Sequence, residues 1–402
     1  MNPIRTFFCR VYQKTLFVCQ TLMNFPIPET LEGQDSMAKI PEYLHEKGKK
    51  KPLVIADPFL VKSGSISLLL DPLKQNQVSF ALFDEVVPNP PFPSIEKAYA
   101  LYRKEECDCL IAIGGGSCID TAKAVGAKAS DPKRKLSSFK GILKVHRRIP
   151  LLLAIPTTAG TGSEATIASV VVNPETKDKF SINDPHLIPR LAVLDSRLLS
   201  SLPPSLIAST GMDALTHAIE SYIGGSRTKL TKKTALEAMC LIKDHLYSFY
   251  SNPKSQIAAE SMQKASFLAG VSFTRGYVGY VHALAHALGG YYGVPHGYAN
   301  AVLLPHVLEA YGKKAEKKLA YAADCLNLSH SPSRKERAQA FLDWVKQLNE
   351  SMGIPKKFKG IILEEDIPSL SLHADKEANP LYPVPKEMNQ AELAAILKEV
   401  RG

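Results

Sequence analysis

Four histidines and one aspartate lie in two short stretches of the sequence that are flanked by apolar residues. Asp213 and His217 are four residues apart in TGMDALTHAIE. His282 and His286 repeat that spacing in YVHALAHALGG, and His296 follows in VPHG. Residues at i and i+4 of a helix project from one face, and imidazole and carboxylate groups together bind divalent metals. A lone histidine here would more often be a core residue, so the clustering favours a metal site, while the spacing does not select four ligands among the five.

Two loops rich in glycine or hydroxyl side chains each follow a predicted buried strand. Gly114-Gly115-Gly116-Ser117 ends the apolar run 109–113 and opens a helix, a context in which backbone N–H groups bind phosphate. It is not the full GxGxxG fingerprint, because Ile119 stands at the last glycine position. The second loop follows the run 151–156 and offers the hydroxyl groups of Thr157, Thr158, Thr161 and Ser163. Two such loops on neighbouring strands favour a dinucleotide site over a tight turn and a polar loop without a ligand.

Asp57 closes a third apolar run, at 52–57. A carboxylate at the carboxyl end of a strand can accept hydrogen bonds from an adenosine ribose and repel a 2′-phosphate, which would favour NAD(H). The alternative is that Asp57 only caps the turn that Pro58 begins. The sequence gives the two interpretations equal weight.

The elements that would position these residues change character near Arg197. Before it, short apolar runs of strand length alternate with helical stretches such as 95–105, and these runs are 52–57, 77–83, 109–113, 151–156, 166–172 and 191–195. After it, four long segments have helical periodicity, at 209–223, 231–250, 260–273 and 338–353. We therefore predict an α/β dinucleotide-binding domain with a parallel sheet over residues 1–197, and an all-helical metal-binding domain over 198–402.

Composition and charge argue against a nucleic-acid partner and leave attraction of anionic substrates open. The 402 residues are 45% hydrophobic and 22% charged, which is ordinary for a globular protein. The net charge of +10 comes from scattered lysines and arginines without interleaved aromatic residues or a nucleic-acid motif. The sequence therefore predicts a solvated basic surface and no nucleic-acid partner.

The N-terminal extension, residues 1–28, contains an uncharged segment at 15–28. That segment is 14 residues long and includes two prolines, whereas a membrane helix needs roughly 20 apolar residues. Met23-Asn24-Phe25 offers no small-residue cleavage site, so we expect a packed or dimer-facing extension and no membrane partner. The seven cysteines include no CxxC pair, which argues against a disulfide framework or zinc ribbon and predicts reduced thiols in a cytoplasmic protein.

Together these segments resemble the iron-containing (group III) alcohol dehydrogenases, which include lactaldehyde reductase and the microbial propanediol and methanol dehydrogenases. The resemblance runs from about residue 25 to the C-terminus, in family order, through FDEVVPNP, GGGSCIDTAKAVG, PTTAGTGSE, LPPSLIASTGMDALTHAIESY and GYVHALAHALGGYYGVPHGYANAVLLPH. It implies a two-domain oxidoreductase with an interdomain cleft. Such an enzyme transfers a hydride between a small primary alcohol, or its aldehyde, and a nicotinamide cofactor.

The resemblance also assigns roles to residues. It implies that the metal ligands are Asp213, His217, His282 and His296. It places the coenzyme contacts at Asp57, Asn89, Gly115, Gly116, Ser117, Asp120, Thr157, Thr158, Thr161 and Lys179. Fe²⁺ is the family's usual metal, and Zn²⁺ or another divalent metal is the alternative by intrinsic affinity. NAD(H) is the expected coenzyme with NADP(H) left open, and the expected assembly is a homodimer or larger homo-oligomer.

His286 is the proposed catalytic residue. In the family pattern it lies near the nicotinamide and is not a ligand, and its imidazole, with an ordinary pKa near ~6.5, suits a proton relay. The alternative is that it only packs or hydrogen-bonds to a neighbour. Thr274, Arg275 and Tyr277 stand where many relatives carry an Asn-rich run, which leaves the substrate open. The rival functions are a glycerol-dehydrogenase-like polyol oxidoreductase, against which His217 argues as a second in-helix ligand, and a non-catalytic scaffold protein.

Overall fold

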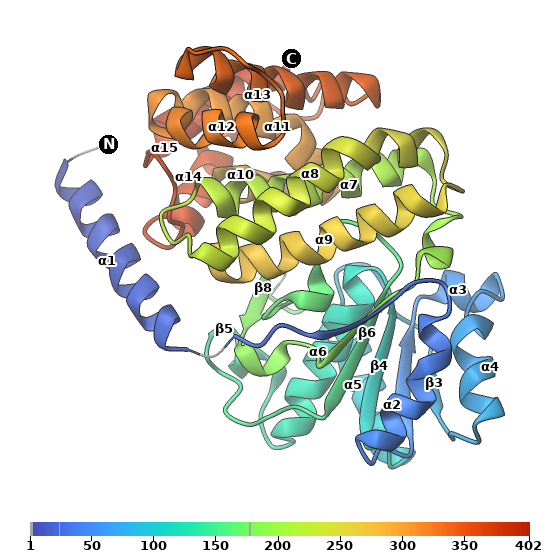
Figure 1. Cartoon of the computed structure of the whole chain (residues 1–402). Coiled ribbons are helices and arrows are strands. Elements are labelled where there is room, and N and C mark those ends of the chain that lie inside the picture. Colours follow the sequence, from blue (N-terminus) through green and yellow to red (C-terminus); the bar gives the residue numbers. More distant parts are fainter. Residues whose placement is uncertain (1–2, 24, 177) are drawn as a thin grey trace. The chain divides into compact units, whose positions relative to one another are not determined.

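The computed structural model describes residues 3–23, 25–176 and 178–402, which group into two compact units (Figure 1). One unit comprises residues 25–201, and the other comprises residues 202–402 together with the N-terminal helix α1 (Pro3–Leu22). The predicted fold class is confirmed, because a six-stranded parallel sheet is followed by a helical region. The domain boundary expected at Arg197 stays a prediction.

The main sheet of the first unit has the strand order β1-β9-β6-β4-β2-β3, and all of its pairs are parallel. Its strands are β1 (Glu29–Glu32), β2 (Pro52–Ala56), β3 (Ala81–Phe83), β4 (Cys109–Gly114), β6 (Leu151–Pro156) and β9 (Leu191–Leu194). The central strands are buried along nearly their whole length, as expected for runs covered on both faces. The run predicted at 77–83 pairs only at β3, because Gln77 has a φ of 56° and belongs to the turn that ends the preceding helix.

Five helices of this unit connect the strands: α2 (Ile40–Glu46), α3 (Pro58–Lys62), α4 (Ser67–Gln75), α5 (Phe92–Lys104) and α6 (Gly116–Ser130). The chain runs outward from β2 to β3 and then returns to the other side of β2 as β4. The strand order therefore reverses between β2 and β4, the position at which open α/β sheets bind ligands. Asp57 and both predicted coenzyme loops follow β2, β4 and β6, so they lie at this same edge.

A second, three-stranded sheet has the order β5-β8-β7. Its strands are β5 (Gly141–Ile142), β7 (Ala168–Asn173) and β8 (Asp178–Asn183), with β7 and β8 antiparallel. The run predicted at 166–172 is largely β7. The sequence analysis missed β8, because the alternation in DKFSIN is short and rests on only two apolar residues, Phe180 and Ile182.

The second unit is helical, and no strand follows β9 in the described part of the chain. Its helices after α1 are α7 (Pro204–Ile223), α8 (Lys229–Ser251), α9 (Gln256–Gly276), α10 (Tyr280–Tyr292), α11 (His296–Tyr311), α12 (Lys313–Cys325), α13 (Arg334–Ser351), α14 (Ile367–Ala378) and α15 (Gln390–Arg401). Every residue of α7 from Gly211 to Ile223 is buried. A helix buried on all sides forms the core of its unit, so α7 is a rigid support for any side chain that it presents.

The N-terminal helix α1 packs on its own unit through its polar side chains. Arg5 pairs with Asp375 at 2.9 Å, and the Nε2 of Gln13 donates to the carbonyl of Tyr382 at 2.9 Å. The opposite face exposes large apolar side chains, among them Phe7 and Phe8. Among the described residues, none of the helices combines the length and apolarity that crossing a membrane requires. The expectation of a dimer-facing extension stays a prediction.

Candidate metal and coenzyme sites

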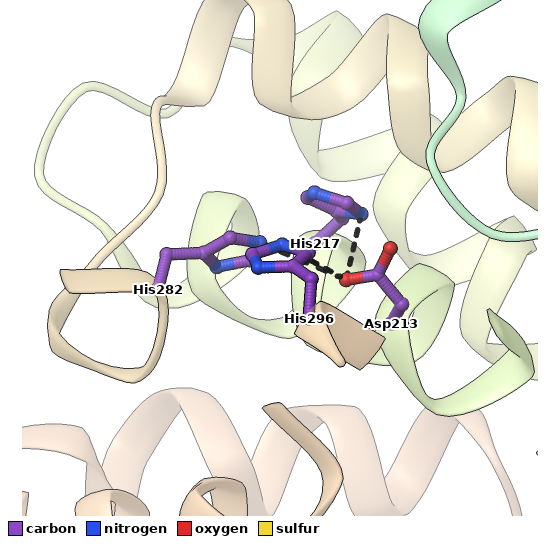
Figure 2. Close-up of side chains that lie close together, drawn as sticks. All are labelled: Asp213, His217, His282 and His296. Atoms are coloured by element: carbon purple, nitrogen blue, oxygen red, sulfur yellow. Dashed lines mark ion pairs between the residues drawn. The ribbon is translucent and has the colours of Figure 1, made fainter. Parts of the chain in front are cut away.

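The structure brings four of the five predicted metal-site residues together. One donor atom from each of Asp213, His217, His282 and His296 lies within 4.8 Å of the other three. The Oδ1 of Asp213 is 3.5 Å from the Nε2 of His296, and it is 4.0 Å from both the Nε2 of His282 and the Nδ1 of His217 (Figure 2). These side chains come from α7, α10 and α11, so residues that are far apart in sequence converge on one carboxylate.

A close helix approach places His296, the first residue of α11, beside α7. The next residue is Gly297, and a Cβ there would lie 2.4 Å from the backbone oxygen of Ser209 on α7. Contacts that short do not occur, so a side chain at this position would push α11 away from α7. The glycine therefore allows His296 to reach Asp213.

Glu220 orients His282 and was missed by the sequence analysis. Its Oε2 lies 2.7 Å from the Nδ1 of His282 and accepts the N–H of Gly279 at 2.7 Å, while its Oε1 accepts the N–H of Val281 at 2.9 Å. Burial raises the pKa of Glu220 to about 7, against the lowering effect of these N–H donors. Burial, followed by the charges of neighbouring histidines, lowers the pKa of His282 well below its usual value. With Nδ1 engaged by Glu220, the ring turns Nε2 toward Asp213, which is the orientation that a histidine ligand needs.

The contacts of Asn300 indicate that the lone pairs of Asp213, His282 and His296 point toward one place. Its Nδ2 donates to the Oδ1 of Asp213 at 2.7 Å, and it lies 3.1 Å from the Nε2 of His296 and 3.3 Å from the Nε2 of His282. Three acceptor atoms thus meet at one amide group in a buried space. One carboxylate with three imidazoles, mostly buried, fits a divalent transition-metal ion. The assignment of these residues as ligands stays a prediction.

His286 lies beside this cluster and is not among its four members. Its ring stacks on that of His296, with 5.1 Å between the ring centroids. Its Nδ1 is 2.7 Å from the Oε1 of Glu377 on α14, a partner that the sequence did not reveal. Its catalytic role stays a prediction.

The residues that depart from the family pattern, Thr274, Arg275 and Tyr277, follow Phe273, which contacts one of the four clustered side chains. The ring of Phe273 stacks on that of His217, with centroids 4.1 Å apart. Thr274 and Arg275 follow it at the end of α9 and are buried, and the Nη1 of Arg275 donates to the carbonyl of Val271 at 2.8 Å. The departing residues therefore lie directly after a ring that contacts a predicted metal ligand.

In the first unit, the two predicted coenzyme loops contact each other. Gly115 caps α6, and Gly116 and Ser117 form its first turn, where helix N–H groups point away from the helix. Thr158 lies against Gly115, and a Cβ at Gly116 would sit 3.1 Å from the Cγ2 of Thr161. Thr157 is buried, and its N–H donates to the carbonyl of Gly114 at 3.1 Å. The glycines thus bring the second loop against the helix N-terminus, an arrangement suited to an anionic ligand.

Asp120 and Lys123 on α6 hold the second loop in place. The carboxylate of Asp120 accepts the hydroxyl of Ser163 at 2.9 Å and the N–H of Val170 at 3.1 Å. The buried Nζ of Lys123 donates to the carbonyl and hydroxyl oxygens of Ser163 and Thr166. Burial lowers the pKa of Lys123 to about 8, with Asp120 opposing the shift. Both oxygens of Asp120 are engaged within the protein, so this residue can support the coenzyme loop even without touching a coenzyme.

The remaining predicted coenzyme residues lie outside the two loops. The Nζ of Lys179 on β8 donates to the Oδ1 of Asn89 at 2.7 Å, so the structure brings this pair together. The Oδ1 of Asp57 accepts the N–H of Phe59 at 2.8 Å and caps α3. Capping uses one carboxylate oxygen and leaves the ribose interpretation of Asp57 open to test. All ten coenzyme contacts stay predictions.

Comparisons with known proteins match almost the whole chain. The profile described as "Iron-containing alcohol dehydrogenase" matches residues 28–196, and "Fe-containing alcohol dehydrogenase family, C-terminal" matches residues 207–401. Alcohol dehydrogenase 4 of Saccharomyces cerevisiae is 34% identical over 92% of this chain and 96% of its own. Lactaldehyde reductase of Escherichia coli is 35% identical over 84% of this chain and 89% of its own. A crystal structure of 1,3-propanediol oxidoreductase superposes with a TM-score of 0.90 at 34% identity, covering 94% of this chain and 99% of that one.

Proposed function

Because the chain belongs to the iron-containing alcohol dehydrogenase family, we propose that it is an iron-dependent, NAD(P)-dependent alcohol dehydrogenase or aldehyde reductase. It transfers a hydride between a small primary alcohol, or its aldehyde, and the nicotinamide. The observation that carries this proposal is the convergence of Asp213, His217, His282 and His296, of which the first three are buried. The resemblance to lactaldehyde reductase and to 1,3-propanediol oxidoreductase supports a short, hydroxylated substrate.

Different residues of the chain would bind the metal, bind the coenzyme and transfer the proton. The four clustered side chains would hold the divalent cation, and Glu220 fixes His282 through Nδ1. A bound cation would supply Lewis acidity toward the substrate oxygen, and a bound nicotinamide would supply the hydride chemistry. Gly115, Gly116 and the facing threonines would receive the coenzyme's phosphates. His286 exchanges the proton that alcohol oxidation releases.

We further propose a cytoplasmic homodimer or larger homo-oligomer that uses NAD(H). The six cysteines whose side chains are described are free thiols, which suits a reducing compartment. A methanol dehydrogenase of Bacillus methanolicus that is 33% identical is named as NAD-dependent, which supports the coenzyme. Sedimentation velocity on the purified protein measures the assembly.

Metal removal and reconstitution test the proposed function. Protein stripped with a chelator is expected to lose turnover of short primary alcohols and aldehydes, and Fe²⁺ is expected to restore it best among Fe²⁺, Zn²⁺, Mg²⁺ and Mn²⁺. The assay is run with NAD(H) and NADP(H), and metal content is measured by mass spectrometry. Full activity in a demonstrably metal-free preparation would refute the proposal.

Asp57 offers a test of coenzyme choice. If its carboxylate faces the adenosine 2′ position, Asp57→Asn should raise the ratio of NADP(H) to NAD(H) activity roughly tenfold, because a like charge is removed from the 2′-phosphate. Asparagine can still cap α3, whereas Asp57→Gly removes both charge and cap, so the pair separates the two roles. An unchanged ratio in both variants would assign Asp57 to capping alone.

A further inference from the structure

Both histidines of α10 hydrogen-bond to a carboxylate through Nδ1. His282 pairs with Glu220 and His286 pairs with Glu377, each at 2.7 Å. The difference lies in exposure, since the side chain of His286 is 38% exposed and that of His282 only 3%. His286 is therefore open to proton exchange while its orientation is held from α14.

We propose that Glu377 is a positioning residue that fixes the imidazole of His286 in the Nδ1–H tautomer and leaves Nε2 as the atom that exchanges the proton. Tyr382 holds Glu377 in place, because its hydroxyl donates to the same Oε1 at 2.7 Å. This inference rests on the proposed function, in which His286 carries the proton of the alcohol.

The tautomer follows from the hydrogen bonds that meet at Glu377. Its Oε1 accepts the hydroxyl hydrogen of Tyr382 at 2.7 Å and lies 2.7 Å from the Nδ1 of His286. A carboxylate oxygen acts as the acceptor in both contacts, so the hydrogen between Glu377 and His286 belongs to Nδ1. A neutral imidazole has one N–H, and Nε2 then carries the lone pair.

The segment that carries Tyr382 is anchored by the N-terminal helix. Gln13 donates to the carbonyl of Tyr382 at 2.9 Å, and the Nη1 of Arg10 donates to the carbonyl of Val384 at 2.8 Å. These contacts fix the backbone at Tyr382 and directly after it, and the hydroxyl of Tyr382 holds Glu377. The chain of contacts from α1 to His286 lies within one compact unit.

Glu377→Gln is the sharpest substitution, because an amide of nearly the same shape can present N–H to Nδ1 and favour the opposite tautomer. We expect kcat to fall about tenfold, the lower end of the effect of losing an orienting partner, with KM and metal content little changed. In a His286→Ala background the same substitution should cause no further loss, because a residue that acts only through His286 has nothing left to orient. Tyr382→Phe, which removes only a hydroxyl, should lower kcat less and in the same direction.

The matched control is Glu399→Gln. Glu399 makes the same kind of pair, with its Oε1 at 2.8 Å from the Nδ1 of His306, on helices α15 and α11. Glu399 is not part of the candidate site, so the turnover of the Glu399→Gln variant is expected to stay within about twofold of the parent. Additive losses from Glu377→Gln and His286→Ala would overturn the proposal.

A readout that does not depend on turnover is ¹⁵N NMR of protein labelled at histidine. The signals of His286 are identified by their loss in His286→Ala, and we expect them to report Nδ1–H in the parent and Nε2–H in Glu377→Gln. An unchanged tautomer in Glu377→Gln would refute the positioning role. If the tautomer changes while His286→Ala retains full turnover, Glu377 still positions the ring, and it is the proposed proton-transfer role of His286 that fails.

Discussion

Asp213→Ala is expected to abolish metal binding and to lower turnover by ~10³-fold or more, since a metal ion supplies several kcal/mol to such a reaction. Its Oδ1 is the atom on which the nitrogens of His217, His282 and His296 converge. It is also the one carboxylate of the cluster, so its loss leaves imidazoles alone to attract the cation. Metal analysis of the purified variant and steady-state assays measure both effects.

Coenzyme binding provides the internal control for this variant. The predicted coenzyme loops belong to the unit formed by residues 25–201, whereas Asp213 belongs to the helical unit. NADH affinity, measured by fluorescence titration, should therefore stay within about twofold of the parent. Asp213→Asn preserves the size of the side chain and separates its charge from its packing. A full complement of metal in both variants would contradict the ligand assignment.

The clustering of Asp213, His217, His282 and His296 was predictable because much of the signal for it is local. The i, i+4 spacing of Asp213 and His217 places them on one face of α7, and a helix is the structure that such a sequence favours. Glu220 follows at i+7 from Asp213 on the same helix, so the same reasoning extended by one turn would have found it. Asn300 likewise lies four residues after His296 on α11.

The positioning of His286 could not be predicted from the sequence. Glu377 lies 91 residues further along the chain, and the pair forms because α14 packs against α10. No motif surrounds this glutamate, and its role depends on packing between helices. The N-terminal helix poses a similar difficulty, since its contacts with Asp375 and Tyr382 join the two ends of the chain. Local patterns therefore predicted the four side chains that converge at Asp213, whereas the partner of His286 depends on tertiary packing.

The parallel sheet was predictable for the reason that makes it stable. Strands buried on both faces are continuous apolar runs, as in β2 and β4, and such runs stand out in a sequence. β8 lacks that signal because its residues are mostly polar. It nevertheless positions Lys179, whose Nζ donates to the Oδ1 of Asn89. A strand in a small sheet is defined by its partners more than by its composition.

His286→Ala is expected to retain bound metal and to lower turnover about 10²-fold, the lower range for loss of a general acid–base group. The structure places His286 next to the cluster, stacked on His296, and outside the four residues that converge. Removing it therefore leaves every candidate ligand in place. The pH dependence of alcohol oxidation should change as well, because the proposed proton-exchange group has been removed.

The control for this prediction is His306→Ala, which removes a histidine that also pairs with a glutamate but takes no part in the cluster of His217, His282 and His296. Its turnover should stay close to that of the parent. Metal content decides between the two roles of His286, since a ligand cannot be removed without weakening metal binding. If purified His286→Ala has lost its iron, His286 is a ligand. If its metal content, rate and pH profile all match the parent, its bond to Glu377 serves packing alone, because a proton relay cannot be deleted without slowing the step that releases the proton.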